Sequence, residues 1–192
     1  MRSLSATAGL SAKSEPSEFR KRLGEPDTMD AMSVPMHPSV EPFAFLLGTW
    51  AGEGSGEYPT IESFDYLETI TFGHVGKPFL AYSQKTTAKD DGRPLHAEVG
   101  YWRFPSLKRT EFVVAHPTGI VEVEEGKFVA SEGGGRFYLH TTTIGRTESS
   151  KEVTALARVF DIEGDSMHYS VTMAAVGRTI QHHLSATLQR VP

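Results

Sequence analysis

The feature that most constrains the fold of this chain is a close succession of short β-type runs separated by turn residues. From residue 49 onward, runs rich in Val, Ile, Thr, Phe and Tyr alternate with reversals such as Asp90–Gly92, Gly133–Gly135 and Glu163–Asp165. Such runs predict strands, and their short connections predict antiparallel pairing. No long amphipathic helix is available to cover a sheet. Closing the sheet on itself is then the simplest way to bury its apolar face and remove its edges.

The predicted strands share this composition and spacing. They cover Thr49–Gly56, Ile61–Phe72, Phe79–Thr87, His96–Arg103, Arg109–Ala115, Gly119–Glu125, Lys127–Ser131, Arg136–Thr143, Val153–Ile162, Ser166–Ala174 and Thr179–Arg190. The sequence therefore predicts an all-β fold, an antiparallel barrel of about ten strands that is lipocalin-like or fatty-acid-binding-protein-like. A barrel of this size has an interior wider than its own side chains fill, which predicts a ligand cavity.

Two N-terminal segments precede these strands. Residues 1–36 carry Ser, Pro and charged residues without a sustained apolar period, which predicts a disordered tail. His37–Gly48 is typical of a short helical segment that ends at a glycine. We therefore expect one barrel domain over residues 37–192.

Composition excludes several classes of function. The net charge of −5 and the absence of zinc-finger or RNP-like motifs argue against nucleic acid as a partner. No apolar run approaches the roughly 20 residues that span a membrane, and residues 1–36 lack the apolar core of a signal peptide, so we expect a cytoplasmic protein that does not enter membranes. The chain has no cysteine, so any metal must be held by His, Tyr, Met or a carboxylate.

One motif stands where the helical segment meets the first strand. Gly48, Trp50, Gly52 and Gly54 form the pattern G-x-W-x-G-x-G. Trp50 can plug the barrel base with its ring while its indole N–H finds a carbonyl, and the glycines permit close approach of the backbone. Further motifs follow in order: Gly56–Ile61, Phe64–Glu68, His74–Phe79, Pro94–Gly100, Gly119–Gly126, Met173–Gly177 and His182–Leu184. Together they resemble the nitrobindin family from about Pro38 to Arg190.

This resemblance implies a cofactor and an activity. Nitrobindins are β-barrels that bind haem b through an axial histidine, bind nitric oxide at ferric iron and isomerise peroxynitrite to nitrate. The resemblance implies that His183 is the haem ligand and the catalytic residue of one haem b per chain. It also implies that Thr60 contacts the haem, and we suggest that Lys151 approaches a propionate, with Arg158 as a weaker candidate. Only one of His182 and His183 can enter the lumen, because successive strand side chains point to opposite faces, and the resemblance selects His183.

Other interpretations stay open at this point. The runner-up function is a non-enzymatic carrier of a fatty acid or another hydrophobic ligand, and a scaffold with a vestigial barrel is a third. A homodimer is compatible with the sequence. Met173 and Phe72 are candidates to line the pocket, whereas we expect His74 and His96 to be structural or solvent-facing. We expect Glu122, Glu124 and Glu125 to form a solvated strand face rather than a metal or acid–base cluster.

Overall fold

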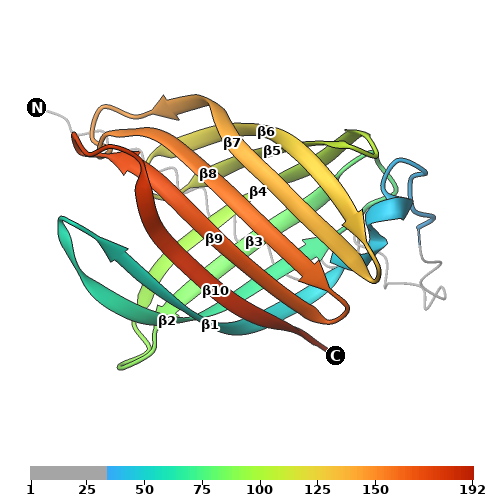
Figure 1. Cartoon of the computed structure of the whole chain (residues 1–192), viewed down its shortest axis with the longest axis horizontal. Coiled ribbons are helices and arrows are strands. Elements are labelled where there is room, and N and C mark those ends of the chain that lie inside the picture. Colours follow the sequence, from blue (N-terminus) through green and yellow to red (C-terminus); the bar gives the residue numbers. More distant parts are fainter. Residues whose placement is uncertain (1–33) are drawn as a thin grey trace, which may run out of the picture. The chain divides into compact units, whose positions relative to one another are not determined.

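Alternating side chains and closely spaced turns produce a closed barrel in the computed structural model, which describes residues 34–192 (Figure 1). Within this part of the chain, a 3-10 helix η1 (Glu41–Leu46) precedes ten strands. They are β1 (Gly48–Tyr58), β2 (Ile61–Gly73), β3 (Leu80–Ala88), β4 (Pro94–Ser106), β5 (Arg109–His116), β6 (Ile120–Ser131), β7 (Gly134–Arg146), β8 (Val153–Glu163), β9 (Ser166–Ala175) and β10 (Gln181–Val191).

Each strand pairs antiparallel with its neighbours in the chain, and β1 closes the ring. Thr49 of β1 pairs with Thr71 of β2 on one side and with Val191 of β10 on the other. The ladder is therefore continuous around the barrel. This confirms the predicted antiparallel barrel, and the predicted helical segment is present as η1.

Alternation decides which side chains fill the lumen, as β9 illustrates. Met167, Tyr169 and Val171 are buried, while His168 between them is exposed.

The prediction of two strands over Gly119–Ser131 is wrong, because β6 runs unbroken through Gly126. An added Cβ at Gly126 would lie 1.7 Å from the carbonyl oxygen of Tyr138, so this glycine permits a close approach of β7 rather than a turn.

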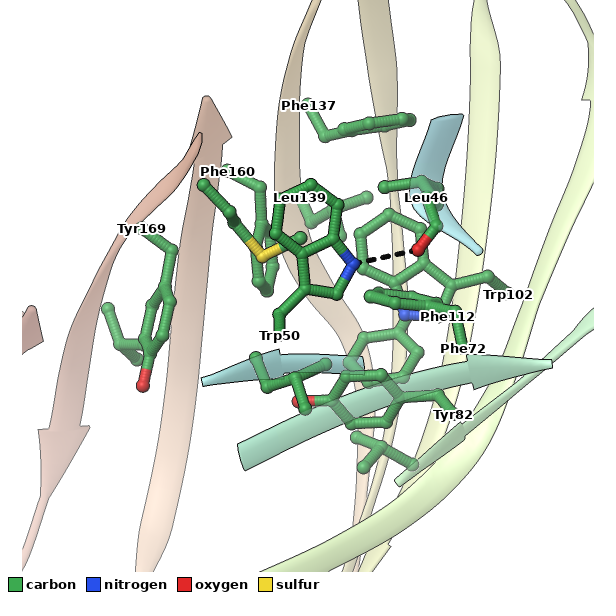
Figure 2. Close-up of a cluster of buried hydrophobic side chains, with 14 of the residues drawn as sticks. Leu46, Trp50, Phe72, Tyr82, Trp102, Phe112, Phe137, Leu139, Phe160 and Tyr169 are labelled. Carbon is green, nitrogen blue, oxygen red and sulfur yellow. Dashed lines mark hydrogen bonds between the residues drawn. The ribbon is translucent and has the colours of Figure 1, made fainter. Parts of the chain in front are cut away.

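Aromatic side chains close one end of the barrel (Figure 2). Trp50 is fully buried there, and its indole N–H donates to the carbonyl oxygen of Leu46 at 2.8 Å. Phe43 of η1 stacks on Phe104 with a centroid distance of 3.7 Å. Gly48 joins η1 to β1 with a φ of 107°, a conformation that favours glycine. Since each buried aromatic side chain removes roughly 150–250 Å² from water, this end forms a hydrophobic core of its own.

The opposite end is open. Because the strands alternate in direction, the reversals at residues 59–60, 89–93, 117–119, 147–152 and 176–180 all lie at this end. No helix among the described residues is long and apolar enough to cross a membrane. The predicted tail over residues 1–36 lies outside the described residues except for its last three, so its disorder stays a prediction.

Candidate functional site

A cavity of about 1110 Å³ occupies the open half of the lumen. This volume lies slightly above the range of typical small-molecule sites, which runs from roughly 300 to 1,000 Å³. Apolar side chains cover much of its wall. They include Leu95, Ile120, Val153, Leu156, Val171, Met173, Ala175 and Leu184. Of the two candidate lining residues, Met173 therefore borders the cavity, whereas Phe72 is buried in the hydrophobic core.

A β-bulge turns His183 into this cavity. His182 pairs with Thr172 and Leu184 pairs with Val171, so His183 is the extra residue of β10. Ala186 is buried in the lumen. If side chains alternated strictly along β10, Leu184 and His182 would point inward as well, and His183 would point outward. The bulge reverses this order, so that His183 and Leu184 line the cavity while His182 is exposed.

The ring of His183 is held in one orientation and one tautomer. Its Nδ1 lies 3.0 Å from the carbonyl oxygen of Glu57, and because a carbonyl can only accept, Nδ1 carries the proton. Nε2 is then left with a lone pair. Burial lowers the pKa of His183 below its ordinary value, although the bond to Glu57 opposes the shift. The imidazole is therefore neutral at physiological pH, which is the state that binds a metal.

The structure brings the other two predicted cofactor residues to the same cavity. Thr60 lies in the reversal after β1, and Lys151 lies in the loop before β8. Both are exposed at the open end. The four residues of the G-x-W-x-G-x-G motif do not line this cavity, because Trp50 belongs to the core at the closed end.

Arg158 does not lie at the rim with Lys151. It is 4% exposed and faces three glutamates inside the lumen. Its guanidinium lies 2.9 Å from Oε2 of Glu122 and 3.4 Å from Oε2 of Glu98, and it also contacts Glu124. An arginine engaged in this way has few donors left for a ligand, so its suggested role as a propionate contact is not supported.

The prediction of a solvated glutamate face on β6 is wrong. Glu122 and Glu124 are 2% and 0% exposed, whereas Val121 is 51% exposed on the outer face. The usual alternation is inverted here because the lumen holds Arg158, which pairs with both carboxylates. Glu125 does lie on the outer side, where it pairs with Arg109 at 2.7 Å.

Charge in the lumen is distributed unevenly among these glutamates. Burial alone would raise the pKa of Glu98, but the positive charge of Arg158 and the hydrogen bonds from His96 and Tyr82 together outweigh it and lower that pKa to about 2. At Glu122, burial is likewise outweighed by Arg158 together with further polar contacts, so its pKa is lowered as well. For Glu124, burial and the negative charge of Glu122 raise the pKa despite Arg158. At neutral pH, Glu98 and Glu122 are therefore ionised, and Glu124 is the one that retains a proton.

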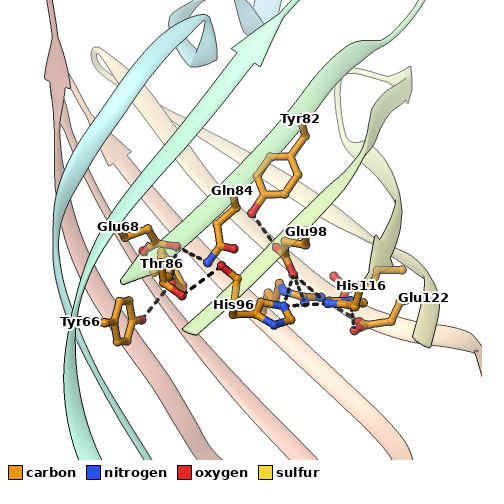
Figure 3. A network of polar contacts seen from close by, with 12 residues as sticks. Tyr66, Glu68, Tyr82, Gln84, Thr86, His96, Glu98, His116 and Glu122 are labelled. Carbon is orange, nitrogen blue, oxygen red and sulfur yellow. Dashed lines mark hydrogen bonds and ion pairs between the residues drawn. The ribbon is translucent and has the colours of Figure 1, made fainter. Parts of the chain in front are cut away.

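Two histidines join Glu98 on the wall formed by β4 and β5 (Figure 3). Nε2 of His96 lies 3.0 Å from Nδ1 of His116, which in turn lies 3.3 Å from Oε2 of Glu98. His96, which was expected to be structural or solvent-facing, is half-buried and borders the cavity. His96 and Glu98 are two residues apart on one strand, which places them on one face, but the sequence does not show that His116 lies beside them.

A second polar chain crosses the lumen through Glu68. The hydroxyl of Tyr169 lies 2.8 Å from Oε2 of Glu68, and Gln84 donates to Oε1 at 2.7 Å. Tyr66 extends the chain, with its hydroxyl 3.0 Å from that of Tyr169. Burial raises the pKa of Glu68 to about 7, although the hydrogen bonds from Gln84 and Tyr169 oppose the shift. Sequence analysis did not single out this residue, although its alternation with Tyr66 and Ile70 places it on the inner face of β2.

Comparison with known proteins shows close relatives over the whole barrel. The chain is 57% identical over 159 residues to peroxynitrite isomerase 1 of Mycolicibacterium paratuberculosis. The matched region covers 83% of this chain and 99% of the relative. It is 53% identical over 158 residues to the peroxynitrite isomerase of Nocardia farcinica, covering 82% and 94% of the two chains.

A solved structure and a family model agree with these relatives. The crystal structure of Rv2717c from M. tuberculosis matches with a TM-score of 0.81 at 46% identity, covering 82% of this chain and all of that one. Residues 39–190 match the family model described as the THAP4-like, heme-binding β-barrel domain. The resemblance drawn from the sequence motifs is thereby confirmed. The chain belongs to the family of THAP4-like, heme-binding β-barrel domains.

Proposed function

We propose that this chain binds one haem b through Nε2 of His183 and uses it to isomerise peroxynitrite to nitrate. The observation that carries the proposal is the geometry of His183. Its imidazole lines a cavity of about 1110 Å³, and its Nδ1–H is anchored on the carbonyl oxygen of Glu57 at 3.0 Å. Membership of a heme-binding family and the names of the relatives support the cofactor and the reaction.

The residues around His183 fit a haem b. An axial histidine commonly donates its second ring N–H to a carbonyl, which fixes the ring and makes the ligand nitrogen more basic. Apolar side chains such as Leu156 and Val171 suit the porphyrin faces. The propionates of haem b need water and cations, and Lys151, Lys89 and Arg93 border the cavity at its open end. Thr60 lies at the same rim, where its hydroxyl can contact the cofactor.

Ferric haem, when held by His183, would supply a coordination position for nitric oxide or peroxynitrite. The protein contributes orientation and shielding. His183 would hold the cofactor, and the bulge and the bond to Glu57 leave its ring little freedom. The apolar wall limits the escape of reactive fragments into water. Conversion of peroxynitrite to nitrate is an isomerisation, so the site needs no external reductant.

The alternative function, a fatty-acid carrier, finds less support in the lumen. A buried carboxylate ligand needs a cation or hydrogen-bond donors that are free to receive it. Among the described residues, Arg158 is the one buried arginine, and three glutamates already surround it. A fatty-acid carboxylate would therefore meet an acidic interior.

Hemin titration of the purified chain tests the proposal. We expect a ferric Soret band that saturates at one hemin per chain and shifts on addition of nitric oxide. His183→Ala should abolish this band while far-UV circular dichroism stays unchanged. His182→Ala is the matched control, because this neighbouring side chain is exposed outside the lumen, and it should bind hemin as the parent does.

Stopped-flow mixing with peroxynitrite tests the reaction itself. The hemin-loaded chain should accelerate peroxynitrite decay and raise the yield of nitrate over nitrite, and the His183→Ala chain treated in the same way should not. An unchanged Soret band in His183→Ala would overturn the ligand assignment. Normal hemin binding without faster decay would leave a haem protein and overturn the enzymatic part.

A further inference from the structure

We propose that His96, Glu98 and His116 form a binding site for one divalent transition-metal ion of the Zn²⁺ type, separate from His183. Each residue offers one ligand atom, and the three atoms lie within 4.8 Å of one another. Two imidazoles and one carboxylate are a ligand set that proteins use for Zn²⁺ and for non-haem Fe²⁺.

The spacing of the three ligand atoms suits one ion between them. Bonds of about 2.0–2.1 Å in tetrahedral geometry place neighbouring ligand atoms about 3.3 Å apart. Here His96 Nε2 and His116 Nδ1 are 3.0 Å apart, and His116 Nδ1 and Glu98 Oε2 are 3.3 Å apart. The third edge, from His96 Nε2 to Glu98 Oε2, is 3.9 Å. Small side-chain rotations would bring all three atoms to bonding distance.

An outer partner already orients one of the three ligands (Figure 3). The hydroxyl of Tyr82 donates to Oε1 of Glu98 at 2.7 Å, which leaves Oε2 facing the histidines. Nε2 of His116 lies 2.8 Å from Oε1 of Glu122 without hydrogen-bond geometry, so Glu122 contributes negative charge beside this ligand rather than a fixed orientation. Outer hydrogen bonds such as that from Tyr82 fix ligand orientation in known metal sites.

The contact between the two histidines allows the cluster to exist without an ion. Across the 3.0 Å between His96 Nε2 and His116 Nδ1, one ring nitrogen donates and the other accepts. On binding of an ion, the shared proton would move to the second nitrogen of the ring that carries it, so that both neutral imidazoles would present a lone pair. The pair of histidines therefore accommodates both states without a change in its total charge.

The surrounding charge favours a cation. Glu98, Glu122 and Glu124 face one guanidinium, that of Arg158. With Glu124 protonated, two carboxylates face one fixed positive charge and leave this part of the lumen with net negative charge. Arg158 does contact Glu98, but at 3.4 Å this is the longest of its three ion pairs, so it competes weakly for Oε2.

The site is also distinct from the haem-ligand candidate. In the closed ring of strands, β5 stands five places from β10 and so lies diametrically across the lumen. His183 can therefore be replaced without touching the cluster. The strand ladder is continuous, and Trp50, Trp102 and Phe137 of the aromatic core do not line the cavity, so we expect the haem-free chain to fold.

Metal titration of the full-length, haem-free chain after chelator treatment tests this proposal. We expect one Zn²⁺ per chain by calorimetry, and visible absorption bands of low-symmetry Co²⁺ that Zn²⁺ removes. His96→Gln and His116→Gln should each abolish binding, and Tyr82→Phe should weaken it about 10- to 100-fold. His183→Ala and His182→Ala are controls that should bind Zn²⁺ as the parent does, with folding of every variant checked by circular dichroism.

Each outcome decides the proposal. Absence of binding to the folded parent would overturn it, as would full binding by folded His96→Gln and His116→Gln. Loss of Zn²⁺ binding in folded His183→Ala would place the ion at the haem ligand instead. Because no haem is present, failure of this site is distinguishable from failure of the Soret test.

Discussion

Replacing Glu68 by glutamine should change how the stability of the barrel depends on pH. Glu68 is 3% exposed, and burial raises its pKa from the ordinary 4.5 to about 7. Between these two values the folded state holds the proton of Glu68 while the unfolded state has lost it. Raising the pH across this window therefore favours unfolding, by about 1.4 kcal/mol per pH unit from this one group.

The magnitude follows from the two pKa values. A difference of about 2.5 pH units corresponds to about 3 kcal/mol of stability that is present below pH 4.5 and lost by about pH 7. Glutamine is isosteric with protonated Glu68: its amide N–H can donate to Tyr169 and its oxygen can accept from Gln84, so both contacts are kept. The variant should match the parent near pH 4.5 and exceed it by about 3 kcal/mol near pH 8.

Urea unfolding at several pH values between about 4.5 and 8 measures this difference directly. Titration of the histidines occurs in both proteins and cancels when the two free energies of unfolding are subtracted. Glu132→Gln is the matched control, because Glu132 is exposed in the turn between β6 and β7, and its difference from the parent should stay near zero. A parent–Glu68→Gln difference that does not change with pH would refute the reasoning.

Two further substitutions probe the closed end and the β6–β7 pair. Trp50→Phe removes the indole N–H that donates to Leu46 and leaves a void, so urea unfolding should show a loss of about 2 kcal/mol; stability equal to the parent would contradict the role of the plug. Gly126→Ala places a Cβ 1.7 Å from the carbonyl oxygen of Tyr138 and should lower the free energy of unfolding by at least about 2 kcal/mol. Gly73→Ala is the control: its Cβ would have nothing within 4 Å, so its free energy of unfolding should stay within about 1 kcal/mol of the parent. Equal effects of the two substitutions would refute the steric argument.

The strands and their closure could be predicted because they depend on local chemistry. Period-2 alternation and turn residues such as Gly164 are visible in any short window of sequence. Gly126 was misleading because the sequence does not distinguish a glycine that allows a turn from one that allows a neighbouring strand to approach. That distinction depends on Tyr138, which becomes a neighbour only once the two strands are paired.

The candidate site was less predictable, for two physical reasons. A β-bulge changes which side chains face the lumen, and residue types alone do not mark the bulge that exposes His182 and turns His183 inward. Buried charges were missed because each depends on a distant partner. Glu122 is buried since Arg158, which lies 36 residues further along the chain, pairs with it, and neither residue alone predicts the contact.

The polar filling of the open half is not a requirement of the barrel. At the closed end, the same ten strands fill the lumen with aromatic side chains such as Trp102 and Phe137, so the fold tolerates an apolar interior. A buried ion pair contributes little to stability compared with apolar side chains of similar volume, and it is strongly destabilising when one partner is lost. A lumen with Arg158 and three glutamates therefore gains nothing in stability that aromatic packing could not supply. The placement of charge and imidazole together in the half that holds the cavity is better explained by what that cavity binds.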